Sequence, residues 1–299
     1  MRTLGLSVVL VGGLLVTPAW ADPPAPGSSP YVDSTFRYDL RIELPIVGVG
    51  LGAWIATEIA KPQLAPQPCR ICERAADGTD QLNGFDAGVR SLLRAGQADI
   101  PGRLSDVTAF GLTPALMIGL GAIANYYQGS PKQGLVDLLM VAESTVLAVD
   151  LNQLVKFAVG RERPFVHVLP EAEKTQGGNA ADNNLSFYSG HTTMAFALAT
   201  SAGTVASLRH YRLAPLIWAL GMPLATLAGL MRISADRHYA TDVLTGMAVG
   251  SAMGFLGPWL HRKQGPRAAV YPVVLSSRQS GPHGTSGVMV GLGLQGTAP

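Results

Sequence analysis

The strongest constraint on this chain is a series of long stretches that contain no charged residue. Four of them are about as long as a membrane-spanning helix: residues 107–127, 192–208, 213–231 and 243–260. Charged residues make up 14% of the 299 residues, whereas an ordinary soluble domain carries about a quarter. We therefore expect an all-α fold, a bundle of about six helices that is embedded in a membrane.

Two further apolar segments supply the remaining helices. Residues 44–57 form a shorter run that is closed by Glu58, and residues 133–159 contain the acidic residues Glu143 and Asp150. Because these two acidic residues are seven positions apart, they share one face of a helix. We interpret them as part of a buried polar network that fixes helix packing.

The N-terminal residues have the pattern of an export signal. Arg2 is followed by an apolar stretch at 4–16 and by a small-x-small cleavage site that ends at Ala21. An uncleaved first membrane helix is the alternative, but the apolar run is short for spanning. The chain then divides into four parts: a signal (1–21), a flexible leader (22–43), a helical domain (44–262, with its motif-bearing core at 105–260) and a short β-like tail (263–299).

The chain has two cysteines, Cys69 and Cys72. A c-type haem site would need His directly after the second cysteine, where Glu73 stands. A structural zinc site would need two more ligands nearby, and the sequence shows none. Because an exported chain enters an oxidising compartment, we expect a local disulfide between Cys69 and Cys72.

Three short polar segments interrupt the apolar helices, at 156–164, 186–191 and 232–242. Three of their cationic residues are Lys156, Arg163 and Arg232. These suit a tetrahedral oxyanion, because guanidinium and ammonium groups bind phosphate oxygens. Ser189 and Gly190 open a helix, where a hydroxyl and backbone amides can donate to an anion.

The same segments supply two imidazoles and a carboxylate. His238 and Asp242 are four positions apart, so on one helical turn the carboxylate can reach the imidazole and fix its tautomer. The other ring nitrogen is then free to act as a nucleophile. His191 is available to protonate a leaving group. Cations, nucleophile and acid together indicate a phosphoryl-transfer site.

These segments resemble the three-part signature of the type 2 phosphatidic acid phosphatase superfamily. That superfamily includes bacterial non-specific acid phosphatases, undecaprenyl-pyrophosphate phosphatases and vanadium-dependent haloperoxidases. The signature reads Lys, six residues, Arg-Pro; then Pro-Ser-Gly-His; then Ser-Arg, five residues, His, three residues, Asp. This chain has Tyr188 in place of Pro and Met231 in place of Ser. We expect Tyr188 to alter the loop and the mouth of the pocket, while no charged or proton-transferring residue is lost.

The resemblance implies a role for each residue. His238 would attack phosphorus, Asp242 would orient His238, and His191 would protonate the leaving group and then activate water. Five residues would hold the phosphate oxygens: Lys156, Arg163, Ser189, Gly190 and Arg232. Arg161 and Arg237 would lie beside this clamp, in supporting or surface positions. The resemblance implies no metal and no cofactor, and the sequence shows no obvious metal-binding cluster.

We expect a metal-independent phosphatase that hydrolyses a phosphate monoester or pyrophosphate of a lipid through a phosphohistidine intermediate. Two alternatives stay open: a vanadate-dependent haloperoxidase, whose clamp would hold vanadate, and a soluble periplasmic non-specific acid phosphatase, whose apolar helices would form its core. All charged and proton-transferring residues of the signature are present, which argues against a non-enzymatic envelope protein. No long basic run with interleaved aromatics is present, so a nucleic-acid partner is not expected. The sequence does not determine the oligomeric state.

By the same resemblance the chain belongs in a bacterial cell envelope, either in the inner membrane with its active site facing the periplasm or free in the periplasm. In the membrane arrangement, the basic segments 209–212 and 261–263 fall on the cytoplasmic side. A cleaved signal would place Asp22 outside, so a full crossing by the next apolar segment would invert every later loop. We therefore expect residues 44–60, short and interrupted by Glu58, to pack on the bundle or the membrane surface without spanning.

Overall fold

The computed structural model describes residues 35–75, 77–170, 173–174, 180–263, 269–278 and 286–295. The expected export signal and most of the expected leader lie outside these residues. The described residues belong to the compact unit Ser34–Pro299.

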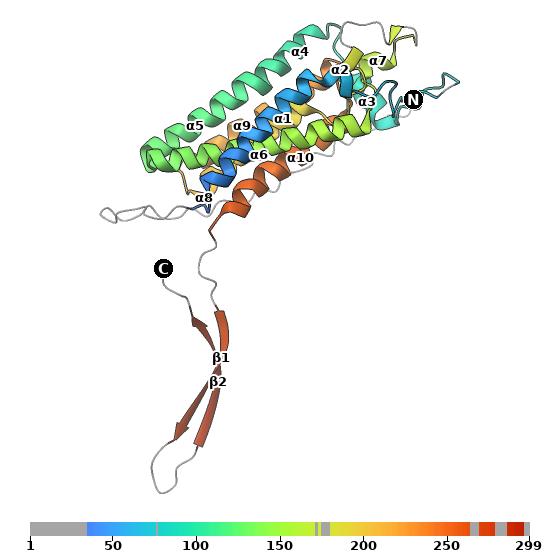
Figure 1. Cartoon of the computed structure of the whole chain (residues 1–299). Helices are drawn as coiled ribbons and strands as arrows, with labels where there is room; N and C mark the ends of the chain where they lie inside the picture. Colours follow the sequence, from blue (N-terminus) through green and yellow to red (C-terminus); the bar gives the residue numbers. More distant parts are fainter. Residues whose placement is uncertain are drawn as a thin grey trace, which may run out of the picture. The chain divides into compact units, whose positions relative to one another are not determined.

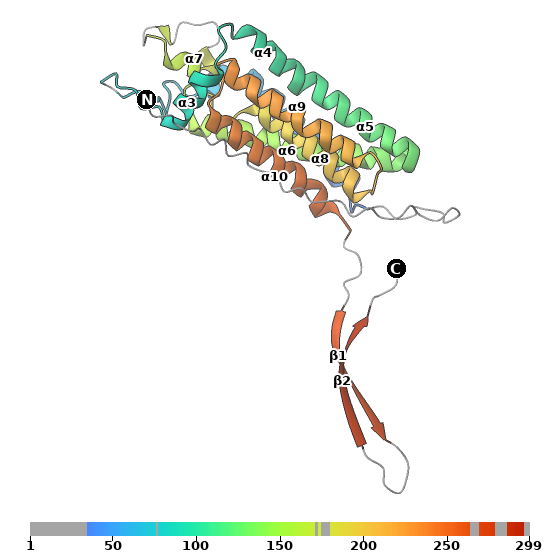
Figure 2. The same cartoon turned by 180° about the vertical axis from the view of Figure 1, so that it is seen from behind.

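Long antiparallel helices form a bundle, which confirms the predicted all-α fold (Figure 1). The described part of the chain contains six long helical runs: α1 (Leu40–Ile59), the continuous α4, η1 and α5 (Asp99–Asp106, Val107–Leu112 and Thr113–Gln128), α6 (Pro131–Val159), α8 (Gly190–Leu208), α9 (Ala214–Ser234) and α10 (Ala240–His261). Helix α8 lies in the centre, packed against α6, α9 and α10, as the view from behind in Figure 2 also shows.

The alternating direction of the helices gathers the polar segments at one end of the bundle. Helices α6 and α9 finish there, and α8 and α10 begin there (Figure 1). Four short elements cover this end: α2 (Lys61–Leu64), α3 (Gly84–Leu93), α7 (Pro164–His167) and η3 (Ala180–Asp182). We call it the motif end, and the other end, where α6 begins and α10 finishes, the distal end.

Helix α1 corrects one prediction from the sequence. It begins at Leu40 because the Asp39 carboxylate caps it, accepting a hydrogen bond from the Arg41 amide at 2.9 Å. The apolar run appears short because Arg41 and Glu43 interrupt it, yet these residues form the first turn of a 20-residue helix. Among the described residues, α1 is one of four helices that are long and apolar enough to cross a membrane. The argument that 44–60 is too short to span is therefore wrong, while α1 does pack on the bundle as expected; whether it spans a membrane stays a prediction.

The other helices of that length and composition are Asp99–Gln128, Ala214–Ser234 and Ala240–His261. Their outward faces, like that of α1, are apolar: Val107 is 61% and Leu260 is 68% exposed, and in α1 Ile59 is 75% exposed. Exposed apolar surface on this scale is unusual for a soluble monomer and typical of a chain that meets lipid or a partner.

Two features outside the helices were expected from the sequence. Cys69 and Cys72 form a disulfide with a Cα–Cα distance of 5.3 Å. Its loop packs on the turn after α6, because the Arg70 amide donates to the Gly160 carbonyl (2.9 Å) and the Glu162 amide donates to the Ile71 carbonyl (2.9 Å). In the tail, β1 (Ala269–Arg278) and β2 (Ser286–Gln295) form an antiparallel hairpin in which Ala269 is opposite Gln295.

Candidate active site

A pocket of about 540 Å³ opens at the motif end, where the three polar segments meet. Six of the eight predicted catalytic and phosphate-binding residues line it: Lys156, Arg163, Gly190, His191, Arg232 and His238. The other two, Ser189 and Asp242, are fully buried and do not line the space. The segments are far apart in the sequence, so the pocket is a product of the fold.

The turn after α6 directs the first segment toward the pocket. Gly160 ends α6 in the left-handed conformation, with φ at 60°, which glycine adopts without steric cost. A Cβ at this position would lie 2.9 Å from Cγ of Pro66. The chain therefore reverses tightly and places Arg161 and Arg163 beside the third segment.

His238 is held with one ring nitrogen facing the pocket. Its Nδ1 lies 2.8 Å from the Ser186 carbonyl oxygen; since a carbonyl only accepts, Nδ1 carries the proton. Nε2 is then left with its lone pair, 3.3 Å from Nη1 of Arg163. Burial, together with the charges of Arg163 and Arg232, lowers the pKa of His238 well below its ordinary value. The imidazole is therefore neutral at neutral pH, the form that a nucleophile requires.

Arg163 is fixed by the loop that contains η3. Its Nη2 pairs with the Asp182 carboxylate at 2.8 Å and its Nε donates to the Asp182 carbonyl at 2.8 Å. Burial alone would raise the pKa of Asp182, but Arg163, Lys156 and Lys61 hold it at about 2. Asp182 is therefore a permanent anion that orients Arg163 and leaves Nη1 directed at His238.

Lys156 reaches the pocket from the last turn of α6, beside the first turn of α8. Gly190 makes this approach possible, because a Cβ there would lie 2.9 Å from Oδ1 of Asn152 and 3.2 Å from Nζ of Lys156. Asn152 also donates from Nδ2 to the Tyr188 carbonyl at 2.8 Å. The N-terminus of α8, with its unpaired amides, is thus held next to a cation.

His191 has a partner that the sequence analysis did not identify. Its Nε2 lies 2.7 Å from Oδ1 of Asp106, in α4, and Nη1 of Arg232 lies 3.5 Å from the same oxygen. Asp106 thus links the second imidazole to the third cation of the clamp. Its position immediately before the uncharged stretch 107–127 is the signal that could have revealed it, because the three motif segments also stand at helix edges.

Asp242 lies within ion-pair distance of His238 but does not hold its Nδ1 proton as the sequence predicted. Its Oδ2 is 3.7 Å from Nδ1 of His238, while it accepts a hydrogen bond from the Ser186 hydroxyl at 2.5 Å and one from the Tyr239 amide at 3.0 Å. The helical-turn argument failed because Asp242 caps the start of its own helix. Since the Ser186 carbonyl holds the imidazole, Asp242 orients His238 through Ser186.

Arg161 holds Asp242 and the surrounding carboxylates in place. It forms ion pairs with three carboxylates, those of Asp242 (2.6 Å), Asp86 (2.9 Å) and Glu73 (2.5 Å), and lies over the Tyr239 ring at 4.2 Å. Burial would raise the pKa of Asp86, but hydrogen bonds from Arg161 and Thr241 lower it. Arg161 is therefore a buried structural centre of the site, while Arg237 lies over the Phe165 ring at 4.9 Å.

Two predicted details differ in the structure, and three pocket residues were not predicted. Tyr188 is buried and does not line the pocket, so this departure from the family signature does not alter its mouth. The Ser189 hydroxyl accepts a hydrogen bond from the Thr192 hydroxyl at 2.8 Å, inside the protein. Helix α1 and the following turn contribute pocket residues that the motifs did not include: Trp54, Glu58 and Lys61.

Comparisons with known proteins point to one family. Residues 137–266 match the model of the PAP2 superfamily. The chain is 31% identical over 175 residues to a lipid A 1-phosphatase of Porphyromonas gingivalis, a match that covers 58% of this chain and 34% of the relative. This chain thus spans about a third of the length of that relative. A transmembrane PAP2-type phosphatidylglycerolphosphate phosphatase of Bacillus subtilis matches with a TM-score of 0.42 and 18% identity, over 73% of this chain and 94% of that one.

Proposed function

We propose that this chain, whose residues 137–266 match the model of the PAP2 superfamily, is a metal-independent phosphatase that acts through a phosphohistidine. One observation carries the proposal: His191, His238 and the cations Lys156, Arg163 and Arg232 line a single pocket. Four cationic side chains face three carboxylates there, so the pocket has a net attraction for a phosphate dianion.

In the first step, Nε2 of His238 attacks phosphorus. The new N–P bond forms as the P–O bond to the leaving group breaks, and His191 gives a proton to the departing oxygen. Arg163, Lys156 and Arg232 stabilise the charge on the three equatorial oxygens. The Ser186 carbonyl, bonded to Nδ1–H of His238, stabilises the cationic ring as the phosphohistidine forms.

In the second step, water replaces His238 on phosphorus. His191, now neutral, takes a proton from the attacking water, the O–P bond forms and the N–P bond breaks, releasing inorganic phosphate. Asp106 orients His191 and stabilises its imidazolium form in both steps, through the 2.7 Å contact at Nε2. Burial in the pocket lowers the pKa of His191 to about 4, so His191 takes up its proton together with a bound phosphate dianion. The cycle ends with His238 neutral and with the proton from water on His191.

We propose a phosphorylated lipid as the substrate. Trp54, Phe110 and Met194 give the pocket an apolar wall, and four of the described helices are long and apolar enough to cross a membrane. The relative that shares 31% identity is a lipid A 1-phosphatase, which makes a glycolipid phosphate the first substrate to test.

The proposed orientation places the motif end in the periplasm. The distal end carries the basic residues Arg209, Arg212, Arg262 and Lys263, which favours the cytoplasmic side. In this arrangement the start of α1 is cytoplasmic, so a cleaved export signal and a spanning α1 exclude each other. An exported-reporter fusion after Gly78, in the loop between α2 and α3, should be active; an active fusion after Arg212 instead would reverse the orientation.

The function is tested by phosphate release from purified full-length protein in detergent. The panel contains lipid A 1-phosphate, phosphatidate, a polyprenyl pyrophosphate and nitrophenyl phosphate, with EDTA present. We expect release from at least one lipid at a higher kcat/KM than from nitrophenyl phosphate, and competitive inhibition by vanadate. Release no greater than that of His238→Ala on every substrate would refute the proposal, and vanadate-dependent halide oxidation would replace it with the haloperoxidase alternative.

A further inference from the structure

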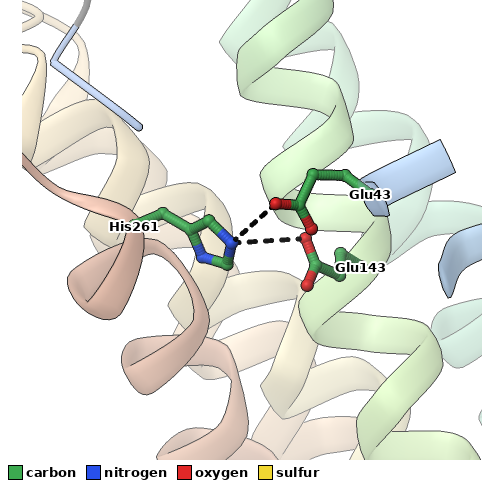
Figure 3. A group of neighbouring side chains, drawn as sticks. All are labelled: Glu43, Glu143 and His261. Carbon is green, nitrogen blue, oxygen red and sulfur yellow. Dashed lines mark ion pairs between the residues drawn. The ribbon is translucent and has the colours of Figure 1, made fainter. Parts of the chain in front are cut away.

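A second polar cluster lies at the distal end, where three helices meet. Glu43 belongs to the first turn of α1, Glu143 to the middle of α6, and His261 is the last residue of α10 (Figure 3). One ligand atom from each side chain lies within 4.8 Å of the other two. The residues are so far apart in the sequence that no spacing pattern connects them.

The imidazole of His261 presents a lone pair to both carboxylates. Its Nδ1 lies 2.8 Å from the Gly257 carbonyl oxygen, so Nδ1 carries the proton and the ring is held in one orientation. Nε2 lies 3.4 Å from Oε1 of Glu43 and 3.9 Å from Oε2 of Glu143, as Figure 3 shows. A backbone carbonyl bound to the second ring nitrogen is the usual support of a metal-ligating histidine.

One carboxylate oxygen of Glu143 has no hydrogen-bond partner among the described residues. Glu143 is only 6% exposed, and this oxygen, Oε2, is buried. That oxygen points into the cluster, toward His261 (Figure 3). In this part of the chain the ion pairs of Glu43 and Glu143 are with His261 alone, so two buried acids converge on one imidazole.

We propose that Glu43, Glu143 and His261 form a binding site for a divalent transition-metal cation, with Zn²⁺ as the best match. One imidazole nitrogen and two carboxylate oxygens are ligands that Zn²⁺ accepts, with a remaining position for water. In a tetrahedral site with bonds of about 2.0–2.1 Å, ligand atoms lie about 3.4 Å apart. The measured 3.4 and 3.9 Å need only a small adjustment to reach this geometry.

The cation would fasten α1 to the bundle. Helix α1 packs chiefly on α6 and supplies Trp54 and Glu58 to the pocket at its other end. A cation bound by the first turn of α1, by α6 and by α10 would link three helices that are far apart in the sequence. This inference does not rest on the proposed function, since the cluster and the pocket at the motif end share no residue.

Metal uptake by tag-free full-length protein in detergent tests the site. The protein is stripped with EDTA, dialysed, and titrated with ZnCl₂, with bound zinc measured by elemental analysis and thermal unfolding followed in parallel. We expect one equivalent of zinc per chain and a Tm that rises by about 5 °C at saturating zinc. Glu143→Gln and His261→Gln should each lose the bound zinc and the Tm increase.

Two matched variants identify where zinc binds. Asp150→Asn removes another carboxylate from α6, and His238→Ala removes an imidazole from the pocket at the motif end; both should keep the full zinc equivalent. The proposal fails if wild-type protein takes up no zinc, or if His261→Gln and Glu143→Gln bind as much as the wild type. A Tm that responds to pH but not to zinc would show that shared protons, and not a metal, satisfy the cluster.

Discussion

The bundle contains two hollows of similar size that differ in the charges around them. The pocket at the motif end, which we call the catalytic pocket after its proposed function, measures about 540 Å³ and is lined by four cations, three carboxylates and two imidazoles. A hollow at the distal end, which we call the apolar hollow, measures about 500 Å³ and is lined by a single charged side chain, Asp137. Size alone therefore does not distinguish a site from a packing gap.

The difference lies in how the charged groups are neutralised. In the apolar hollow, the Asp137 carboxylate accepts hydrogen bonds from Nε of Arg209 and from the Tyr211 hydroxyl, both at 2.7 Å. That charge is satisfied within the protein. In the catalytic pocket, by contrast, four cations face three carboxylates among the lining residues, so one positive charge is left without a carboxylate. An excess charge that faces a pocket indicates binding or chemistry, and a charge whose partners all lie inside the protein indicates packing.

The largest expected effect is on kcat, and it should be seen for a variant in the catalytic pocket but not for one in the apolar hollow. His238→Ala should lower kcat by on the order of 10⁴-fold or more, because it removes the nucleophile, with little change in Tm. Asp137→Asn should leave kcat within about twofold but lower the free energy of unfolding by about 3–5 kcal/mol, because Arg209 stays buried without its counter-charge. Steady-state kinetics and thermal unfolding measure both; a large loss of kcat in Asp137→Asn would remove the distinction.

A smaller effect is expected at the partner of the second imidazole. Asp106→Asn should lower kcat by about 10- to 100-fold for a lipid phosphate, because His191 loses its orienting carboxylate. Nitrophenyl phosphate, whose leaving group needs little protonation, should be affected less. An equal decrease for both substrates would show that Asp106 does not act through His191.

The pH profile should show that His238 stays neutral in mildly acidic solution. Because its pKa lies well below the ordinary value, protonation removes the nucleophile only as pH falls through that lowered pKa. With nitrophenyl phosphate, whose leaving group needs little protonation by His191, kcat/KM corrected for ionisation of the substrate should change by less than about twofold between pH 7.5 and 6.5. A decrease of about tenfold over that interval would mean that the imidazole is not held in its neutral form.

The smallest expected effect concerns the apolar hollow alone. Tyr211→Phe removes the hydroxyl that donates to Asp137 and accepts from Nδ2 of Asn125 at 3.1 Å. Stability should fall by about 1 kcal/mol, and kcat should be unchanged for every substrate. If this variant changed lipid turnover but not nitrophenyl phosphate turnover, the apolar hollow would have to be counted as part of the substrate site.

The sequence predicted the helices and most of the pocket for physical reasons. Uncharged stretches of spanning length leave few alternatives to helices, and the position of a motif at a helix edge determines the end at which it lies. His191, His238, Arg163 and Arg232 line the pocket as their spacing indicated. The disulfide between Cys69 and Cys72 followed from their proximity in the sequence.

What the sequence did not predict depends on contacts between distant segments. Asp106, Asp182 and Lys61 reach the pocket from three separate elements, and none belongs to a motif. Asp242 seemed close to His238 on one helical turn, but capping of α10 redirects its carboxylate to Ser186 and Tyr239. The start of α1 was obscured by the charged residues Arg41 and Glu43, which belong to its first turn.

The central claim is that His238 carries the phosphoryl group during turnover. The most direct measurement is rapid acid-free quenching of the enzyme with a radiolabelled lipid phosphate, followed by peptide mapping. We predict a label that is stable to base and labile to acid, located on the peptide that contains His238 and absent from His238→Ala. A wild-type enzyme that hydrolyses the substrate while this peptide stays unlabelled, or a label on another residue, would contradict the account.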